Sequence, residues 1–246
     1  MRIFGLIGYP LAHSFSKKYF TDQFEREQTA GCSYELFPLE SITDILALLE
    51  NSSLEGLNVT IPYKVAVLPY LNELDVAAKE IGAVNCISIK RKGDKIELKG
   101  FNTDAYGFDE SLRPLLKPFH TNALILGDGG AAKAVKYVLG QLGIPYRSVV
   151  RTPAEDAIVY AELTEELIHT HQVIINTTPL GTFPNVDASP AIPYEYLTEH
   201  HLAYDLVYNP AESLFLQRAK AQGAVIKNGM EMLHLQADRS WTIWNS

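Results

Sequence analysis

The sequence predicts an α/β protein with two α/β domains, and three observations support this. Short apolar runs alternate with amphipathic stretches through the first hundred residues, and the alternation starts again at Thr121. A glycine-rich turn, Gly127-Asp128-Gly129-Gly130, separates an apolar run from a helical pattern. Alternating strands and helices form βαβ units, which imply mainly parallel sheets covered by helices. A chain of 246 residues is long enough for two domains.

In the first hundred residues, apolar runs indicate strands, and apolar residues at helical spacing indicate helices. Tyr19, Phe20 and Phe24, for example, fall on one face of a helix. The expected strands are 2–7, 33–39 and 57–60, with a hairpin of 83–90 and 95–99 around Lys92-Gly93-Asp94. The expected helices are 16–28 and 41–51, and another segment follows at 64–71.

After residue 120 the same alternation gives strands at 123–126, 148–150, 173–175 and 202–206, with a helix at 131–142. The two later strands end in polar residues, Asn176-Thr177-Thr178 and Tyr208-Asn209. We expect the domains to join near residues 104–120. A last helix at 230–244 comes too late in the chain to be assigned clearly to either domain.

Composition excludes several classes of protein. The chain is 47% hydrophobic and 20% charged, which argues against extensive disorder. Its 21 basic and 29 acidic residues give a net charge of -8, which argues against a general nucleic-acid binder. Two cysteines are too few for a disulfide framework, and no zinc-ligand spacing appears. With neither a signal-peptide pattern nor a membrane-length apolar run, we expect a soluble cytoplasmic protein without a metal.

The glycine turn has the context of a dinucleotide-binding loop because it follows a strand and opens a helix. Gly127 permits the tight turn, and Gly129 lets the backbone approach a pyrophosphate at the helix N-terminus, beside Gly130 and Ala131. Ala132 is small enough for close helix–sheet packing. Glycines at such a turn are often only structural, but the strand–turn–helix context favours a Rossmann-type nucleotide-binding domain.

The end of the next strand indicates which nucleotide binds. An NAD site usually has an acidic residue there for the ribose 2′-hydroxyl, whereas this chain has Arg151 and Thr152. Arg151 can pair with a 2′-phosphate and Thr152 can donate to it, which favours NADP. Glu155 and Asp156 lie close by in the sequence and oppose a phosphate, and an exposed arginine after a strand is common.

A lysine and an aspartate at strand ends suggest proton transfer. Lys64 follows the strand of 57–60, and Asp104 follows Gly100-Phe101-Asn102-Thr103. Open α/β folds bind ligands at such strand ends. A lysine can protonate a developing alkoxide near neutral pH if partial burial lowers its pKa. We hypothesise that Lys64 exchanges the proton and that Asp104 orients it and a substrate hydroxyl. The alternatives are a solvated lysine and an N-cap aspartate.

Short polar side chains near these positions suit a polyhydroxylated acid. Ser14 and Ser16 can both donate to a carboxylate near a helix N-terminus, although one of them can instead cap that helix. Asn58, Thr60 and Asn85 offer neutral donors and acceptors at strand ends, where such residues are also common turn and backbone partners.

Together these segments resemble the shikimate dehydrogenase family, and the resemblance spans nearly the whole chain. The segments that carry it are Gly8-Tyr9-Pro10-Leu11-Ala12-His13-Ser14-Phe15-Ser16, Asn58-Val59-Thr60-Ile61-Pro62-Tyr63-Lys64, Gly82-Ala83-Val84-Asn85, Gly100-Phe101-Asn102-Thr103-Asp104, the Gly127 loop, Asn176-Thr177-Thr178-Pro179-Leu180-Gly181, Asp205-Leu206-Val207-Tyr208-Asn209-Pro210 and Asn228-Gly229-Met230-Glu231-Met232-Leu233-His234-Leu235-Gln236.

The resemblance implies NADP-dependent, reversible reduction of 3-dehydroshikimate to shikimate in aromatic amino-acid biosynthesis. It implies a substrate-binding domain of residues 1–104 plus about 229–246, to which the last helix returns, and an NADP-binding domain of about 105–228. By resemblance Lys64 and Asp104 are the catalytic pair. The residues it places at the substrate are Ser14, Ser16, Asn58, Thr60, Asn85, Tyr208 and Gln236. Leu206 and Gly229 fall near the nicotinamide.

Two departures from the family pattern bear on these expectations. The second basic residue of the 2′-phosphate clamp is missing, because Ala154-Glu155 follows Arg151-Thr152-Pro153, and this leaves NAD as an alternative cofactor. Cys86 replaces a common threonine, and we expect it to be a packed small residue rather than a reactive thiol.

The sequence leaves three alternative functions. They are an NAD-using quinate/shikimate dehydrogenase, a catalytically silent paralogue that binds ligand, and a folate-type dehydrogenase of similar layout, which has no reason to keep the serine pair. We expect a monomer or homodimer that binds a small-molecule substrate, and neither nucleic acid nor membrane.

Overall fold

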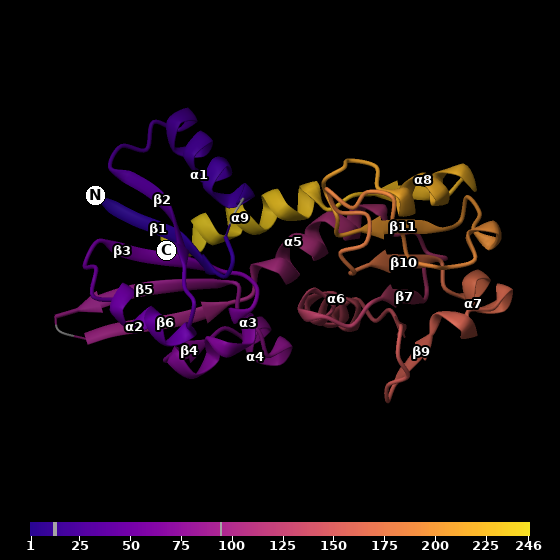
Figure 1. The fold of residues 1–246 in the computed structure, drawn as a ribbon, viewed down its shortest axis with the longest axis horizontal. Coiled ribbons are helices and arrows are strands. Elements are labelled where there is room, and N and C mark those ends of the chain that lie inside the picture. The colour runs from indigo at the N-terminus through magenta and orange to yellow at the C-terminus, as the bar shows by residue number, and fades with distance from the viewer. Residues whose placement is uncertain (12–13, 94) are drawn as a thin grey trace. The chain divides into compact units, whose positions relative to one another are not determined.

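The computed structural model describes residues 1–11, 14–93 and 95–246, which form two compact units (Figure 1). The first unit comprises residues 1–103 and 236–246, and the second comprises residues 104–235. The elements up to residue 101 are β1 (Arg2–Gly8), α1 (Phe15–Arg26), β2 (Cys32–Pro38), α2 (Ile45–Leu48), β3 (Leu54–Val59), α3 (Tyr63–Ala66), β4 (Glu73–Leu74), α4 (Val76–Ile81), β5 (Cys86–Lys92) and β6 (Lys95–Phe101). They are followed by α5 (Thr103–Leu112), β7 (Ala123–Leu126), α6 (Gly130–Gln141), β8 (Tyr146–Val150), β9 (Ala157–Val159), α7 (Glu165–Thr170), β10 (Val173–Asn176), β11 (Leu202–Asp205), α8 (Leu214–Ala221), β12 (Val225–Lys227) and α9 (Met230–Trp244).

The sheet of the first unit has the strand order β2-β1-β3-β5-β6-β4. β1 runs parallel to β2 and β3, and β4 runs parallel to β6. β5 is antiparallel to both β3 and β6, which confirms the predicted hairpin. Because β3 and β5 run in opposite directions, the end of β3 lies beside the start of β5, with Asn58 opposite Cys86. The sheet therefore brings two polar segments distant in sequence to one edge.

Both faces of this sheet are buried. Ile7 and Leu57 lie in one apolar cluster, and Phe4 lies in another that includes Trp244 of α9. The Phe4 and Trp244 rings stack with centroids 4.8 Å apart, and the Trp244 indole Nε1 donates to the Ile87 carbonyl at 3.0 Å. A side chain at Gly56 would overlap this indole. The C-terminal half of α9 is thus a covering layer of the first sheet.

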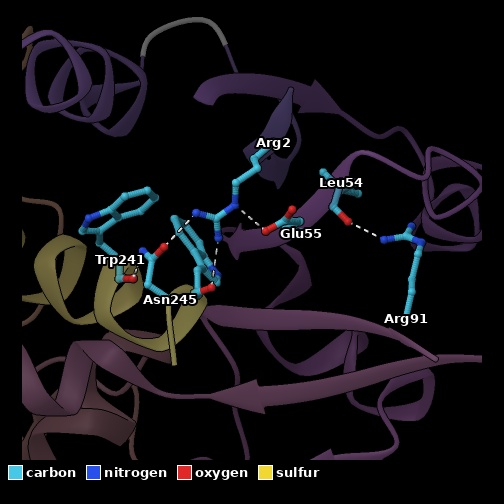
Figure 2. Close-up of polar contacts among 7 residues, drawn as sticks. Arg2, Leu54, Glu55, Arg91, Trp241 and Asn245 are labelled. Atoms are coloured by element: carbon cyan, nitrogen blue, oxygen red, sulfur yellow. Dashed lines mark hydrogen bonds and ion pairs between the residues drawn. The ribbon is translucent and has the colours of Figure 1, made fainter. Parts of the chain in front are cut away.

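Arg2, at the start of β1, forms hydrogen bonds with the C-terminal end of α9 (Figure 2). Its guanidinium donates to the Glu55 carboxylate at 2.6 Å, to Asn245 Oδ1 at 2.8 Å and to the Trp244 carbonyl at 3.3 Å. A partly exposed ion pair alone contributes about 0–1 kcal/mol. The added contacts matter more here, because they satisfy a carbonyl at the C-terminal end of the helix.

The sheet of the second unit is parallel throughout, with the strand order β12-β11-β10-β7-β8-β9. Figure 1 labels β11, β10, β7 and β9 of this sheet. Counted within the unit, this is the doubly wound order of a Rossmann fold, and its direction reverses between β7 and β10. Leu126 lies opposite Asn176, and Asn176 lies opposite Asp205, so these strands end level with one another. The predicted Rossmann-type fold is confirmed.

Several short elements differ from the sequence-based expectations. The segment 41–51 is a turn of 3₁₀-helix at Ile42–Asp44 followed by α2, rather than one continuous helix. The elements β4, α4, β9, α7, α8 and β12 were not predicted from the sequence. β9 and β12 have only three residues each, too few to show a periodic pattern.

Cys86 is fully buried, and burial raises the pKa of its thiol to about 12. It is therefore a packed small residue, as expected, because almost no thiolate forms at neutral pH. In the described part of the chain, no helix is long and apolar enough to cross a membrane, and no group of three or more His, Cys, Asp or Glu side chains can hold a metal ion.

Three buried histidines precede strands of the second sheet: His120, His171 and His201. His120 and His201 share one arrangement, in which Nδ1 accepts from the backbone N–H three residues earlier and Nε2 lies near a backbone carbonyl. The His171 Nδ1 instead lies 2.8 Å from the Leu167 carbonyl. Burial lowers the pKa of all three imidazoles below the ordinary value of 6.5. The folded protein therefore holds them neutral.

We predict that the free energy of unfolding falls as the pH is lowered from about 7.5 to about 6. In this window the unfolded chain takes up protons at the ordinary histidine pKa, whereas the folded chain resists protonation of the three buried imidazoles, so the free energy of unfolding falls. Asp205, whose pKa is raised to about 6, has the opposite effect, but it is one group against three. Urea titrations at the two pH values measure the effect. His201→Asn should flatten this dependence, whereas replacement of the exposed His200 by Gln should not. A stability that rises toward pH 6 would contradict the prediction.

Candidate active site

Asn58 lies at the centre of a buried polar network in the first unit. It belongs to β3 and is 5% exposed. Its Oδ1 accepts from the Tyr34 hydroxyl at 2.8 Å, and its Nδ2 donates to the Asn85 carbonyl at 3.2 Å and to Ser240 Oγ at 3.0 Å. β2, β3, the segment before β5 and α9 thus meet at one side chain.

Asn85 continues this network to the start of α5. Its Oδ1 accepts from the Thr103 N–H at 2.6 Å, and its Nδ2 donates to Thr103 Oγ1 at 3.0 Å. The Thr103 hydroxyl lies 3.4 Å from Gln236 Oε1 and 3.3 Å from Ser240 Oγ. All four side chains are buried. The structure therefore brings together Asn58, Asn85 and Gln236 of the predicted substrate residues.

The two serines of the first unit have different partners. Ser14 is the N-cap of α1, and its hydroxyl accepts from the Lys17 N–H at 3.4 Å. Ser16 lies in the first turn of that helix and interacts with the phenol of Tyr34, whose pKa is raised well above its ordinary value by burial. That phenol therefore remains a donor at neutral pH. His13, which precedes Ser14 in the same motif, lies outside the described residues.

Lys64 is the second residue of α3 and is half-buried. It follows a turn in which the Thr60 N–H donates to the Ile7 carbonyl at 2.9 Å and the Thr60 carbonyl accepts from the Tyr63 N–H at 2.9 Å. The Lys64 carbonyl accepts from the Val84 N–H at 2.8 Å. These backbone bonds fix Lys64 beside the strand ends of the first sheet.

Asp104, the second residue of α5, is also half-buried. It directly follows Thr103, whose N–H is held by Asn85, so the start of its helix has a fixed anchor. Lys64 belongs to the first unit, whereas Asp104 opens the second. Their pairing stays a prediction.

In the second unit, the glycine turn lies at the point where the strand order reverses. Gly127 has φ +99°, and a Cβ there would lie 2.9 Å from Thr178 Cγ2 and 3.0 Å from Thr177 Oγ1. A Cβ on Gly129 or Gly130 would instead enter open space at the N-terminus of α6. This side-chain-free surface fits a pyrophosphate, which can accept from the exposed amides of a helix N-terminus. Gly127, Gly129, Gly130 and Ala131 are therefore suitably placed to hold a dinucleotide.

Arg151 and Thr152 follow β8 and are exposed. The Arg151 charge opposes the rise that burial causes in the pKa of Tyr160, which places the guanidinium near that phenol. Glu155 and Asp156 are also exposed in this segment. The 2′-phosphate role of Arg151 and Thr152 stays a prediction.

Leu206 and Tyr208 follow β11 at the same edge as the glycine turn, and both are half-buried. The Gly229 N–H donates to the Val207 carbonyl at 3.2 Å, and a Cβ on Gly229 would overlap the Leu206 carbonyl. Only glycine allows this close approach. The structure thus brings Leu206 and Gly229 into contact, in keeping with a shared predicted role.

The fully buried carboxylate of Asp205, at the end of β11, stabilises this edge through hydrogen bonds. It accepts from Asn176 Nδ2 at 2.9 Å, from the Val207 N–H at 3.0 Å and from the Ser213 hydroxyl at the start of α8. Asn176 Oδ1 in turn accepts from the Thr178 N–H at 3.0 Å. Burial raises the Asp205 pKa to about 6. The ends of β10 and β11 are therefore held together by side chains.

Several of these supporting residues were missing from the predicted sites. They are Tyr34, Thr103, Asn176, Thr177, Thr178, Asp205, Ser213 and Ser240. The polar end of the predicted strand at 173–175 gave a signal for Asn176, Thr177 and Thr178. Ser240 follows Gln236 by one helical turn, and that spacing is its only sequence signal.

Comparisons with known proteins agree with this geometry. Residues 6–87 match the profile described as the shikimate dehydrogenase substrate binding domain. Shikimate dehydrogenase (NADP(+)) of Halothermothrix orenii is 36% identical, and the match covers 99% of this chain and 90% of the relative. The crystal structure of shikimate 5-dehydrogenase from Thermus thermophilus in complex with NADP(H) and shikimate has a TM-score of 0.85 and 33% identity, covering 99% of this chain and 93% of that one.

A chorismate mutase/shikimate 5-dehydrogenase fusion protein from Clostridium acetobutylicum is also similar. Its crystal structure has a TM-score of 0.86 and 35% identity, covering 100% of this chain and 91% of that one. Identity above 30% over nearly the full length of both chains, together with the shared fold, leads to one conclusion. The chain belongs to the shikimate dehydrogenase family.

Proposed function

We propose that this protein catalyses the reversible, NADPH-dependent reduction of 3-dehydroshikimate to shikimate. The observation that carries the proposal is the full-length similarity to proteins named shikimate dehydrogenase (NADP(+)). Two sites at the ends of strands, one in each unit, also support the proposal. One site is a buried polar network with Lys64 nearby, and the other is a glycine turn at the reversal point of a parallel sheet. Such reversal points are where doubly wound folds bind nucleotides.

In this proposal most of the substrate-binding side chains belong to the first unit, and Tyr208 belongs to the second. The hydroxyls of Ser14 and Ser16 donate to the carboxylate, and Asn58, Thr60, Asn85, Tyr208 and Gln236 contact the ring hydroxyls. Asn58 and Asn85 already make several bonds within the protein, and these bonds fix the direction of their amides. Amides held in this way select a pattern of hydroxyls without a large ordering cost on binding.

Lys64 is the proposed proton donor. The bound nicotinamide supplies a hydride to the carbonyl carbon of the substrate, and negative charge develops on the carbonyl oxygen. The Lys64 ammonium gives its proton to that oxygen, which completes the new hydroxyl, and the reverse reaction returns the proton to the amine. Asp104 orients the ammonium and accepts from a substrate hydroxyl.

NADP is the proposed cofactor, with Arg151 and Thr152 binding its 2′-phosphate and Leu206 and Gly229 beside the nicotinamide. A specific observation keeps NAD as the second candidate. The positions after Arg151 expose Glu155 and Asp156, which repel a phosphate, and no second basic residue lies beside them in the sequence. We further propose a cytoplasmic monomer or homodimer.

Turnover of shikimate by the purified protein, with NADP and NAD compared at matched concentrations, tests the proposal. Strong NADP-linked oxidation is the expected result. Preference for NAD, or faster turnover of quinate than of shikimate, would support the alternative quinate/shikimate dehydrogenase. Absence of turnover with both nucleotides would support a catalytically silent relative.

Replacement of Lys64 by Ala should lower kcat by about 10²–10⁴-fold, because general acid–base catalysis contributes that much. The KM for shikimate should change much less. Steady-state kinetics measure both. Lys79 is an exposed lysine of the same unit, so Lys79→Ala is the matched control and should keep normal turnover. Near-normal turnover in Lys64→Ala would remove this residue from the mechanism.

Replacement of Arg151 by Ala should raise the KM for NADP by about tenfold, the cost of about 1.4 kcal/mol expected when a charge-assisted contact is lost. The KM for NAD should stay the same, because NAD lacks the 2′-phosphate. Arg147, an exposed residue of β8, gives the matched control Arg147→Ala. Equal increases for the two nucleotides would show that Arg151 does not read the 2′-phosphate.

A further inference from the structure

The glycine turn of this chain has its own negative charge. Asp128 lies between Gly127 and Gly129, and its side chain is 43% exposed. Its carboxylate pairs with the ammonium of Lys136, with Nζ and Oδ1 2.6 Å apart. Lys136 lies on α6, the helix that the turn opens, and its side chain is 26% exposed. The ion pair therefore belongs to the proposed phosphate-binding segment.

An unpaired carboxylate in this position would oppose the binding of a pyrophosphate. The N-terminus of a helix attracts anions, so a carboxylate close to it competes for the same partial positive charge and repels an incoming phosphate. The N-cap residue, Gly129, has no side chain to satisfy the helix amides itself. Asp128 is one residue before it and is the nearest acidic side chain in the sequence.

We propose that Lys136 sets the affinity for the dinucleotide by neutralising Asp128 and holding its carboxylate away from the phosphate-binding amides. This inference rests on the proposed function, because the ligand is the NADP or NAD of that proposal. With both side chains present, the turn and its helix carry no net charge from this pair. Without Lys136, the same turn carries one negative charge next to the pyrophosphate.

The role is distinct from recognition of the 2′-phosphate. In Rossmann-type folds the pyrophosphate lies at the first turn after a strand, whereas the ribose at the end of the next strand carries the 2′-group. Asp128 is in the first of these segments, and Arg151 is in the second. Because NADP and NAD share the pyrophosphate, the effect of Lys136 should be the same for both nucleotides.

The experiment measures dissociation constants for NADP⁺ and NAD⁺ by calorimetric titration of the full-length protein without shikimate. Lys136→Met should weaken the binding of both nucleotides by about tenfold, a typical effect for one unscreened charge near a phosphate. Asp128→Asn should bind them as tightly as the wild type, or more tightly. The double variant Asp128→Asn/Lys136→Met should return to within about threefold of the wild type.

Lys220→Met is the matched control. It removes another ion-paired lysine of the same unit, whose Nζ lies 2.7 Å from Glu212 Oε1, and it should leave both dissociation constants unchanged. Circular dichroism checks that each variant is folded. Because recovery in the double variant requires a folded protein, it also separates an electrostatic effect from misfolding.

Unchanged binding in Lys136→Met would overturn the inference. So would a double variant as weak as Lys136→Met, because Lys136 would then act on the ligand directly, or a loss confined to NADP⁺. If the wild type binds neither nucleotide, the proposed function fails together with the inference. If the wild type binds NADP⁺ and turns over shikimate while Lys136→Met binds equally well, only the inference fails.

Discussion

The Asn85 side chain accepts from the backbone N–H of Thr103 at 2.6 Å, and the polar edge of the first unit depends on this contact. A buried amide without partners costs about 1–3 kcal/mol, so each polar group at the strand ends needs a neighbour. Thr103 and Ser240 supply these neighbours from distant parts of the chain. The requirement for hydrogen bonds explains why α9 places the polar side chains of Gln236 and Ser240 at the end of the first sheet. Trp244 of the same helix packs on the apolar face of that sheet, against Phe4.

The second unit meets the same requirement in another way. Its strands are parallel and end level with one another, so their last residues project toward one edge. Asp205 binds the neighbouring strand through Asn176 and the start of α8 through Ser213. Gly127 and Gly229 then provide the close backbone approaches that larger residues would block. The hydrogen bonds of Asp205 fix the strand ends, and the glycines leave the backbone there accessible. Both features suit an edge that binds a phosphate-rich ligand and positions its reactive ring.

The sequence predicted the parts of this structure that depend on local pattern. The buried strand of 123–126 and the last helix of 230–244 have the predicted bounds, because a continuous apolar run and a long helical period mark them. Ser240 and Asp205 were not predicted as supporting residues, because their roles arise from partners 182 and 29 positions away in sequence. The three-residue strand β9 was missed since it is too short to have a period. The roles of Lys64 and Asp104 rested on their positions at strand ends, on the chemistry of proton transfer and on the family resemblance.

We propose that most substrate contacts lie at the strand ends of the first unit and that the pyrophosphate of the nucleotide binds at the strand ends of the second. Hydrogen–deuterium exchange with each ligand alone tests it most directly. Shikimate alone should slow exchange in peptides that contain residues 57–60, 84–86 and 236–240, and NADP⁺ alone should slow exchange in peptides that contain residues 127–132 and 205–208. Protection by shikimate confined to the glycine turn, or protection by NADP⁺ confined to the first unit, would contradict the account.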